Sequence, residues 1–225
     1  RPAISLPDFS NIELRVPSIQ IQEIDIETRL QLFLAELASK NISESDLANP
    51  QDQVSHEFVK KFSNSESLDE LKREIALLLK KEGIIQQGLI ARDLLITKLL
   101  NDLEIPLPED LIEKEVMEHL AREPEHDVDA HKIEVENEIR RSLKTDYLLD
   151  VISRTNRIEI TDSEINDYLV KAAQRFSISP QDLANQLEKA GQIQSLMAEV
   201  ARSKALALAL SQISIVDSDG HSVQL

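Results

Sequence analysis

The chain of 225 residues contains no cysteine, no tryptophan and only four glycines. Without cysteine, a disulfide framework, a thiol nucleophile and a thiolate zinc site are all excluded. The scarcity of glycine leaves little room for the glycine-rich loops that cradle phosphate groups. Because aromatic residues make up only 3% of the chain, any core must be built from Leu, Ile, Val and Ala, as helical bundles often are.

Positive charge is also scarce. The chain has 41 acidic against 25 basic residues, which gives a formal net charge of −16. Nucleic acids and anionic membrane surfaces both require clustered cations, so we expect neither as a partner. No apolar run approaches the roughly 20 residues that cross a bilayer. We expect a cytoplasmic protein with basic or unfolded partners. Because the sequence begins Arg1-Pro2 without Met, we also expect it to be processed or a fragment.

One arrangement occurs twice, at residues 105–116 (IPLPEDLIEKEV) and 158–169 (IEITDSEINDYL). Each stretch begins with alternating apolar residues and then places carboxylates where a helix starts. Thr161 and Glu164 have the spacing of a capping box, and Pro108 suits the first position of a helix. The repeat predicts stacked helical hairpins, which favours a binding or scaffolding role.

The periodicity of apolar residues predicts a mainly α fold. We expect helices over 25–38, 67–102, 108–122, 132–155, 162–176, from Pro180 to about Gly191, and 193–212, with a short helix around 57–62. Ser67 caps the longest of these, with Glu70 three residues on, and this helix would be roughly 50 Å long. Its apolar stripe is predicted to contain Leu68, Leu71, Ile75, Leu78, Leu79, Ile85, Leu89, Leu95, Ile96 and Leu99.

The ends of the chain are predicted to be extended. Prolines interrupt residues 1–24, and their alternating apolar residues indicate a segment laid along another surface, with strand pairing. The tail, ISIVDSDGHSVQL, predicts a small β-hairpin. The expected architecture is thus an elongated helical body with two helical-hairpin arms, an extended N-terminal linker segment and a short C-terminal β-hairpin. In the long helix, Gly83 and Gly88 each cost about 1 kcal/mol relative to Ala and indicate a bend or a point where another helix comes close.

Several blocks together resemble the C-terminal substrate-binding body of trigger factor, the bacterial ribosome-associated chaperone, in an actinobacterial form. They include residues 1–34, HEFVKKF at 56–62, SLDELKREIALLLKKE, the two repeated stretches, and the ending from SPQDLANQLEKAG to VDSDGHSVQL. The resemblance implies a three-part organisation: an extended linker and first helix at 1–37, a junction at 38–66, and a helical body with arms at 67–225.

Two modules of that family have no counterpart in this sequence. The resemblance implies a ribosome-docking domain with a basic loop, and nothing in the chain matches it. It also implies an FKBP-like prolyl isomerase between the first helix and the HEF block, where only about residues 38–55 remain, too few to fold alone. At the junction, Ser55 and His56 stand where relatives tend to place acidic residues. We therefore expect no enzymatic activity, and contact with the ribosome only through a domain missing here.

Chemical sites are poorly supported. His119, His126 and His131 lie near one another among acidic residues, but they show no HExxH spacing, so a solvated tip over 125–131 is the preferred interpretation. Asp217 and Asp219 begin like a calcium loop whose remaining ligands are absent, which favours a hairpin turn. Acidic pairs such as Glu109 with Asp110 suit the positive ends of helices. We predict no catalytic residue, no metal and no cofactor.

The apolar residues of the predicted arms are the functional candidates, because an open cradle must leave some of them exposed. For any single residue, plain core packing is the more frequent explanation. The candidates for substrate binding are Leu94, Leu95, Met117, Leu120, Leu148, Leu149, Ile152, Leu183, Leu187, Leu196 and Met197.

The first functional hypothesis is an ATP-independent chaperone that holds unfolded or nascent polypeptides, since the chain has no P-loop. The second is an acidic helical adaptor for one folded partner, which the repeated hairpins fit equally well. The helical body of a periplasmic chaperone such as SurA is a further alternative in architecture. Self-association is left open.

Overall fold

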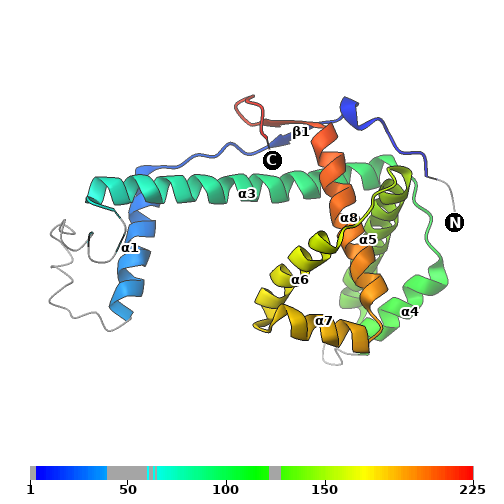
Figure 1. Ribbon diagram of the computed structural model, residues 1–225. Helices are drawn as coiled ribbons and strands as arrows, with labels where there is room; N and C mark the ends of the chain where they lie inside the picture. Colours follow the sequence, from blue (N-terminus) through cyan, green and yellow to red (C-terminus); the bar gives the residue numbers. More distant parts are fainter. Residues whose placement is uncertain (1–3, 40–59, 61–62, 64, 122–127, 225) are drawn as a thin grey trace. The chain divides into compact units, whose positions relative to one another are not determined.

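A computed structural model describes residues 4–39, 60, 63, 65–121 and 128–224, and it is mainly helical, as predicted (Figure 1). The predicted helix at 57–62 and most of the junction lie outside the described residues. Contacts divide the chain into two compact units. The first, here called the α1 unit, contains Arg15–Ile90 and Ile215–Leu225; the second, the α5 unit, contains Arg1–Leu14 and Ala91–Ser214. None of the described helices combines the length and apolar character that a membrane span requires.

The α1 unit is built on α1 (Glu23–Ser39) and the N-terminal part of α3 (Leu68–Asp102). Both helices begin with acidic first turns, which complement the positive end of the helix dipole. The Ser67 hydroxyl accepts from the Glu70 N–H at 3.2 Å, which confirms the predicted cap. The core between the two helices is Leu30, Leu71 and Ile75, with Ile26, Phe33, Leu34, Leu68 and Leu79 packed against it.

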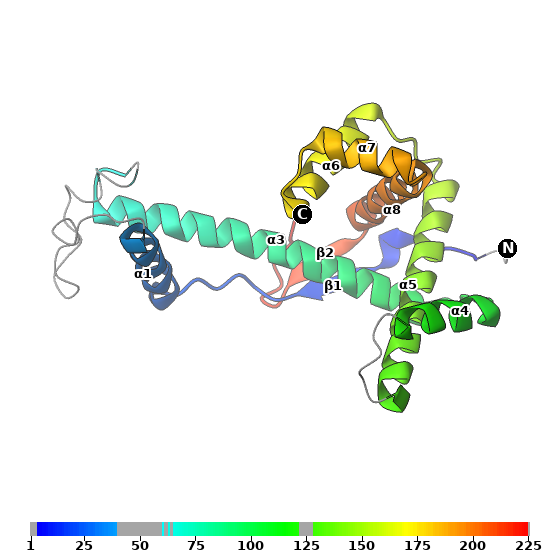
Figure 2. The ribbon, with the colours of Figure 1, turned by 90° about the horizontal axis from the view of Figure 1, so that it is seen from below.

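The first hairpin of the α5 unit joins α4 (Glu109–Leu120) and α5 (Val128–Thr155), which are in contact and cross each other in Figure 2. Its core is Ile112, Val116 and Val135, and Leu107, Leu120, Ile139 and Leu143 surround it. Two predicted boundaries are corrected. Pro108 is the N-cap of α4, not its first helical residue, and α5 starts at Val128, inside the stretch predicted to be a polar tip.

Three further helices complete the α5 unit: α6 (Asp162–Phe176), α7 (Pro180–Lys189) and α8 (Ile193–Gln212). The predicted capping box at α6 is confirmed: Glu164 N–H donates to Thr161 Oγ1 at 3.3 Å, and Thr161 N–H donates to Glu164 Oε2 at 2.8 Å. These helices share a core of Leu169, Leu196 and Val200. Helix α8 also packs along α5, where the Arg202 guanidinium bonds Asp146 and Asp150 at 2.7 Å each.

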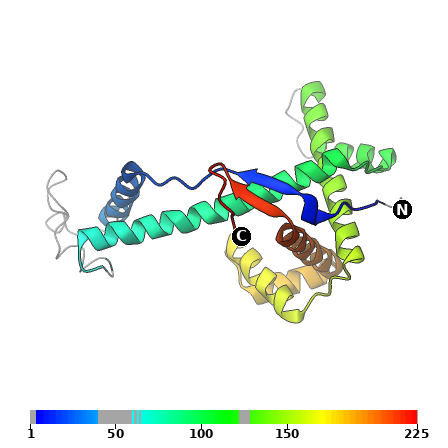
Figure 3. The same cartoon turned by 90° about the horizontal axis from the view of Figure 1, so that it is seen from above.

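A short 3-10 helix, η1 (Phe9–Asn11), precedes a two-stranded sheet of β1 (Glu13–Val16) and β2 (Ser214–Asp217). Ser214 N–H donates to the Ile12 carbonyl at 2.9 Å, and the Ser218 hydroxyl donates to the Val16 carbonyl at 3.3 Å. The two strands therefore run parallel, as Figure 3 shows. The predicted pairing of the N-terminal segment is confirmed. The tail does fold back, but through a single antiparallel bridge between Val216 and Ser222.

The burial of Leu148 on α5 leads to a first prediction about stability. Its side chain is fully buried (0% exposed), whereas that of Leu111 on α4 is 38% exposed. Truncating a buried Leu loses transfer free energy and leaves a cavity, so we expect Leu148→Ala to lower the free energy of unfolding by about 2–5 kcal/mol. Leu111→Ala should change it by about 0.5 kcal/mol. Urea denaturation of the two variants measures both values, and equal losses would contradict the assignment of Leu148 to the core.

The cap of α6 leads to a second prediction. Lys204, at 2.6 Å, and the Thr161 N–H and hydroxyl lower the pKa of Glu164 from 4.5 to about 2. A lowered pKa in the folded state means that this stabilisation is complete above pH 4.5 and is lost as the pH falls toward 2. We expect Glu164→Gln to flatten the fall of the melting temperature with pH over that interval. Glu159→Gln, an exposed neighbour outside the cap, is the control and should keep the wild-type slope.

Candidate binding surfaces

The α1 unit exposes an unusual number of large apolar side chains. On the N-terminal part of α3, the exposed residues are Leu77 (61%), Leu78 (44%), Ile84 (39%), Ile85 (64%) and Leu89 (51%). On α1, Ile24 (60%) and Leu32 (59%) are also exposed. Soluble proteins rarely leave a contiguous apolar surface uncovered unless something binds to it. These exposed side chains are therefore the strongest candidates for binding among the described residues.

A groove of about 500 Å³ lies between α1 and α3 within this unit. Its walls are mainly apolar, and three charged residues complete them; the lining residues are Arg29, Leu32, Phe33, Glu36, Leu71, Glu74, Ile75 and Leu78. Arg29 forms an ion pair with Glu82, and the Ser65 hydroxyl donates to Glu74 at 2.7 Å. Arg29 and Glu74 are thus paired with neighbours in this unit. The apolar part of the lining is aliphatic apart from the ring of Phe33.

The predicted apolar stripe of α3 is partly corrected by these exposures. Leu71, Ile75, Leu95 and Leu99 are buried, as the stripe requires, but Leu78, Ile85 and Leu89 are exposed. These three residues recur at intervals of seven and four and so share a second face of the helix. The signal for this face was present in the sequence, because adjacent pairs such as Leu77-Leu78 and Ile84-Ile85 make the stripe wider than one packed neighbour can cover.

A second groove, of about 390 Å³, lies between α4 and α5 in the α5 unit. Met117 stands at its edge with 69% of its surface exposed, above the buried residues Ile112 and Val116. Arg140 closes one side, donating to Glu109 at 3.0 Å and to Glu136 at 2.9 Å. The hydrogen bond from Arg140 lowers the pKa of Glu109. Methionine adapts its shape to different apolar ligands, which suits a groove of low specificity.

The eleven residues predicted for substrate binding are found in three environments. Five are buried in the α5 unit, with at most 7% of their surface exposed: Leu95, Leu148, Leu149, Ile152 and Leu196. Five are half-buried: Leu94, Leu120, Leu183, Leu187 and Met197. Met117 is exposed. Of the set, only Met117 and Leu120 line a described groove.

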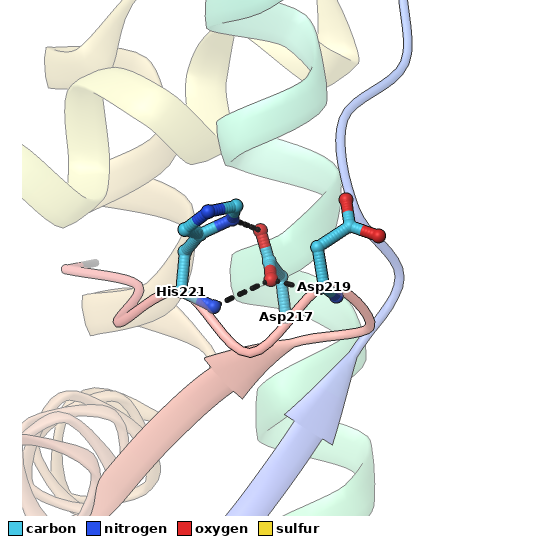
Figure 4. A group of neighbouring side chains, drawn as sticks. All are labelled: Asp217, Asp219 and His221. Atoms are coloured by element: carbon cyan, nitrogen blue, oxygen red, sulfur yellow. Dashed lines mark hydrogen bonds and ion pairs between the residues drawn. The ribbon is translucent and has the colours of Figure 1, made fainter.

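The candidate metal-binding groups are accounted for by local structure. His119 and His131 face each other across α4 and α5, with ring centroids 6.2 Å apart, while His126 lies outside the described residues. Asp217, Asp219 and His221 form a second cluster (Figure 4). There, Asp217 Oδ1 accepts from the backbone N–H groups of Asp219 and His221 at 2.9 Å each. These bonds lower the pKa of Asp217 and are those of a tight turn, as predicted.

The fold is thus a mainly helical one whose distinctive surface is apolar. Residues 67–211 match the family model described as the C-terminus of bacterial trigger factor protein. The chain is 33% identical over 173 residues to the trigger factor of Kineococcus radiotolerans, which covers 77% of this chain and 37% of that protein. It is 32% identical over 186 residues to the trigger factor of Clavibacter michiganensis subsp. michiganensis, covering 83% and 38%. The chain spans less than two fifths of the length of these relatives.

The chain belongs to the trigger factor family of chaperones and corresponds to its C-terminal region. Both relatives come from actinobacteria, which agrees with the actinobacterial form expected from the sequence. The region matched by the family model runs from α3 into α8. It therefore includes α3, which forms one wall of the α1–α3 groove, and both helices of the α4–α5 groove.

The turn at Asp217 leads to a third prediction. Oδ1 of Asp217 is bonded to two backbone N–H groups, and Oδ2 lies 3.4 Å from Nδ1 of His221. A cation would therefore have to compete with partners already in place at both oxygens. We expect Ca²⁺ or Zn²⁺ at millimolar concentration to leave the melting temperature within about 1 °C of the value in chelator. A rise of several degrees that disappears in Asp219→Asn would contradict this and indicate a metal site.

Proposed function

We propose that this chain holds unfolded or nascent polypeptide segments on its apolar grooves without using ATP. The observation that supports this most directly is the uncovered apolar surface of the α1 unit, where Leu32 and Leu78 border a groove of about 500 Å³. The α4–α5 groove with Met117 is a second contact site of the same kind. The net charge of −16 helps to keep a complex with an apolar client in solution.

The magnitudes suit transient holding. A contact of about 400 Å² at about 25 cal/mol per Å² gives about 10 kcal/mol of gross stabilisation. The loss of translational, rotational and side-chain freedom opposes it by about 4–15 kcal/mol. Each groove alone therefore binds a segment weakly and releases it quickly. A long unfolded chain that reaches two grooves at once gains avidity without any new type of contact.

The remaining parts of the proposal follow from the position of this chain within its relatives. The chain matches the C-terminal region of the family, and the isomerase domain implied by the resemblance has no counterpart in its sequence. We propose that the chain has no prolyl isomerase activity, that it reaches the ribosome only through that family's separate docking domain, and that it works in the cytoplasm.

A fourth prediction tests the holding function. At several-fold molar excess and without ATP, the chain should suppress the aggregation, measured by light scattering, of two unrelated unfolded proteins. The double variant Leu32→Ser with Leu78→Ser removes apolar groups from the rim of the α1–α3 groove, and it should lose at least half of the suppression. Its helical content and melting temperature, measured by circular dichroism, should remain close to those of the wild type because both side chains are largely exposed.

The matched control is Val170→Ser with Ile193→Ser, which removes two exposed apolar side chains (42% and 38%) that line neither groove. It should suppress aggregation as the wild type does. An adaptor for one folded partner would protect neither client, so failure with both clients would reject the holding function and favour the adaptor. Equal losses in the two double variants would show that the groove is not the site.

A further inference from the structure

Between β1 and α1, residues 17–21 (Pro-Ser-Ile-Gln-Ile) run in an extended conformation beside α3 and are here called the strap (Figure 1). Both the strap and the part of α3 that it follows belong to the α1 unit. The strap lies outside the β1–β2 sheet, because β1 ends at Val16. Among the described residues, a single hydrogen bond ties it to the helix, from Gln87 Nε2 to the Pro17 carbonyl at 2.7 Å.

The surface of α3 under the strap has two features that recognise an extended peptide. Gln87 is 5% exposed, although glutamine is mostly an exposed residue, and its amide is directed at a backbone carbonyl. One helical turn earlier, Gly83 leaves a notch for Ile19. A Cβ atom at position 83 would lie 2.8 Å from Ile19 Cγ2 and 3.1 Å from Cγ1. Gly83 lowers the helix propensity of α3, but the absence of a side chain there lets Ile19 pack directly against the helix.

The strap fills this surface imperfectly. The hydroxyl of Ser18 is buried and has no hydrogen-bond partner in the described structure, which makes docking of the strap less favourable than it would be with an apolar residue. A cavity of about 310 Å³ remains along the contact. The lining from α3 is neutral, with aliphatic and amide side chains: Leu79, Gly83, Gln86, Gln87 and Ile90.

We propose that the Gly83–Gln87 surface of α3 is a binding site for an extended, neutral polypeptide segment, and that the strap occupies it as a releasable stand-in for such a segment. The ligand is a peptide that presents one backbone carbonyl to Gln87 and, two residues later, a β-branched aliphatic side chain to the Gly83 notch. This inference deepens the proposed function and rests on it. It adds a third contact site, which opens only when the strap leaves.

Intramolecular competition sets the behaviour of this site. A ligand binds only the fraction of molecules whose strap is undocked, so its apparent dissociation constant is the intrinsic value divided by that fraction. Weakening the strap therefore tightens binding of a peptide added in trans, and strengthening it has the opposite effect. The site is therefore occupied by the strap until a client segment is long or concentrated enough to displace it.

The test uses a fluorescein-labelled peptide of residues 15–22, RVPSIQIQ, and fluorescence anisotropy with the whole chain. Ile19→Ala removes the side chain that fills the notch and should tighten peptide binding by about tenfold. Ser18→Ala removes the unpartnered hydroxyl, strengthens the strap and should weaken peptide binding severalfold. Gln22→Ala changes an exposed side chain just beyond the strap, and it is the matched control that should leave binding unchanged.

Gly83→Leu fills the notch with a side chain that favours the helix, so it should abolish peptide binding while α-helical content by circular dichroism is kept. A peptide with Asn at the position of Ile19 should not bind the wild type or Ile19→Ala. The amide ¹H–¹⁵N chemical shifts of Ile19, Gln20 and Ile21 report the strap directly and should move toward random-coil values in Gly83→Leu and Ile19→Ala.

The inference is overturned if Ile19→Ala, Ser18→Ala and Gln22→Ala bind the peptide equally, if Gly83→Leu still binds it, or if none binds at 1 mM. Light scattering on the same variants separates this result from the proposed function. Suppression of aggregation that is unaffected by every strap variant, with no peptide binding, would leave the holding function standing and remove only the strap site. Peptide binding with no suppression by the wild type would remove the holding function and keep the site.

Discussion

The structure of the α1 unit depends on an imbalance between the apolar surface of α3 and the elements available to cover it. Apolar residues lie on more than one face of its N-terminal part: Leu71 and Ile75 pack against α1, whereas Leu78, Ile85 and Leu89 are exposed. Among the described residues, α1 and the strap cover part of this surface. A helix with so wide an apolar surface is normally placed in the centre of a bundle. Here it is left partly open, and the exposure of Ile85 and Leu89 is a direct result of the number of neighbours that the chain supplies.

Charge plays the complementary role, because most of the ion pairs among the described residues link separate elements. Lys72 joins α3 to α1 through Glu23 at 2.8 Å, Arg140 joins α5 to the start of α4, and Arg202 joins α8 to α5. Each bond is partly exposed and contributes modestly to stability. Together they fix which helix faces which in a chain whose cores are built almost entirely of similar aliphatic side chains.

Much of the fold could be predicted from the sequence because its local signals agree with its periodicity. The boundaries of α6, α7 and α8 follow from Thr161 with Glu164, from Ser179 with Pro180, and from Gly191, whose φ of +66° suits only glycine well. The start of α5 was misplaced because a polar composition was interpreted as a loop, although polar residues are normal on one face of a hairpin helix.

The binding surfaces were less predictable, and the reason is geometric. Periodicity shows which residues share a face, but it does not show whether that face meets a neighbour. Leu148 and Ile152 were therefore chosen as candidates although α8 packs along that helix and both are buried, and Leu32 was overlooked. Gly83 was predicted to mark a bend or a point where another helix comes close. A close approach is found, but the partner is Ile19 of an extended segment, whose position no local pattern could give.

The parallel pairing of β1 with β2 has a consequence for the synthesis of the protein on the ribosome. The hydrogen bond from Ser218 to Val16 joins residues 202 positions apart, so β1 is synthesised long before its partner strand exists. At about 5–20 residues per second, the ribosome needs roughly 10–40 s to reach β2. During that interval Leu14 and Val16, which are buried in the finished sheet, belong to an unpaired edge. The N-terminal strand is therefore an open edge, able to pair with other chains, until the C-terminal strand has been made.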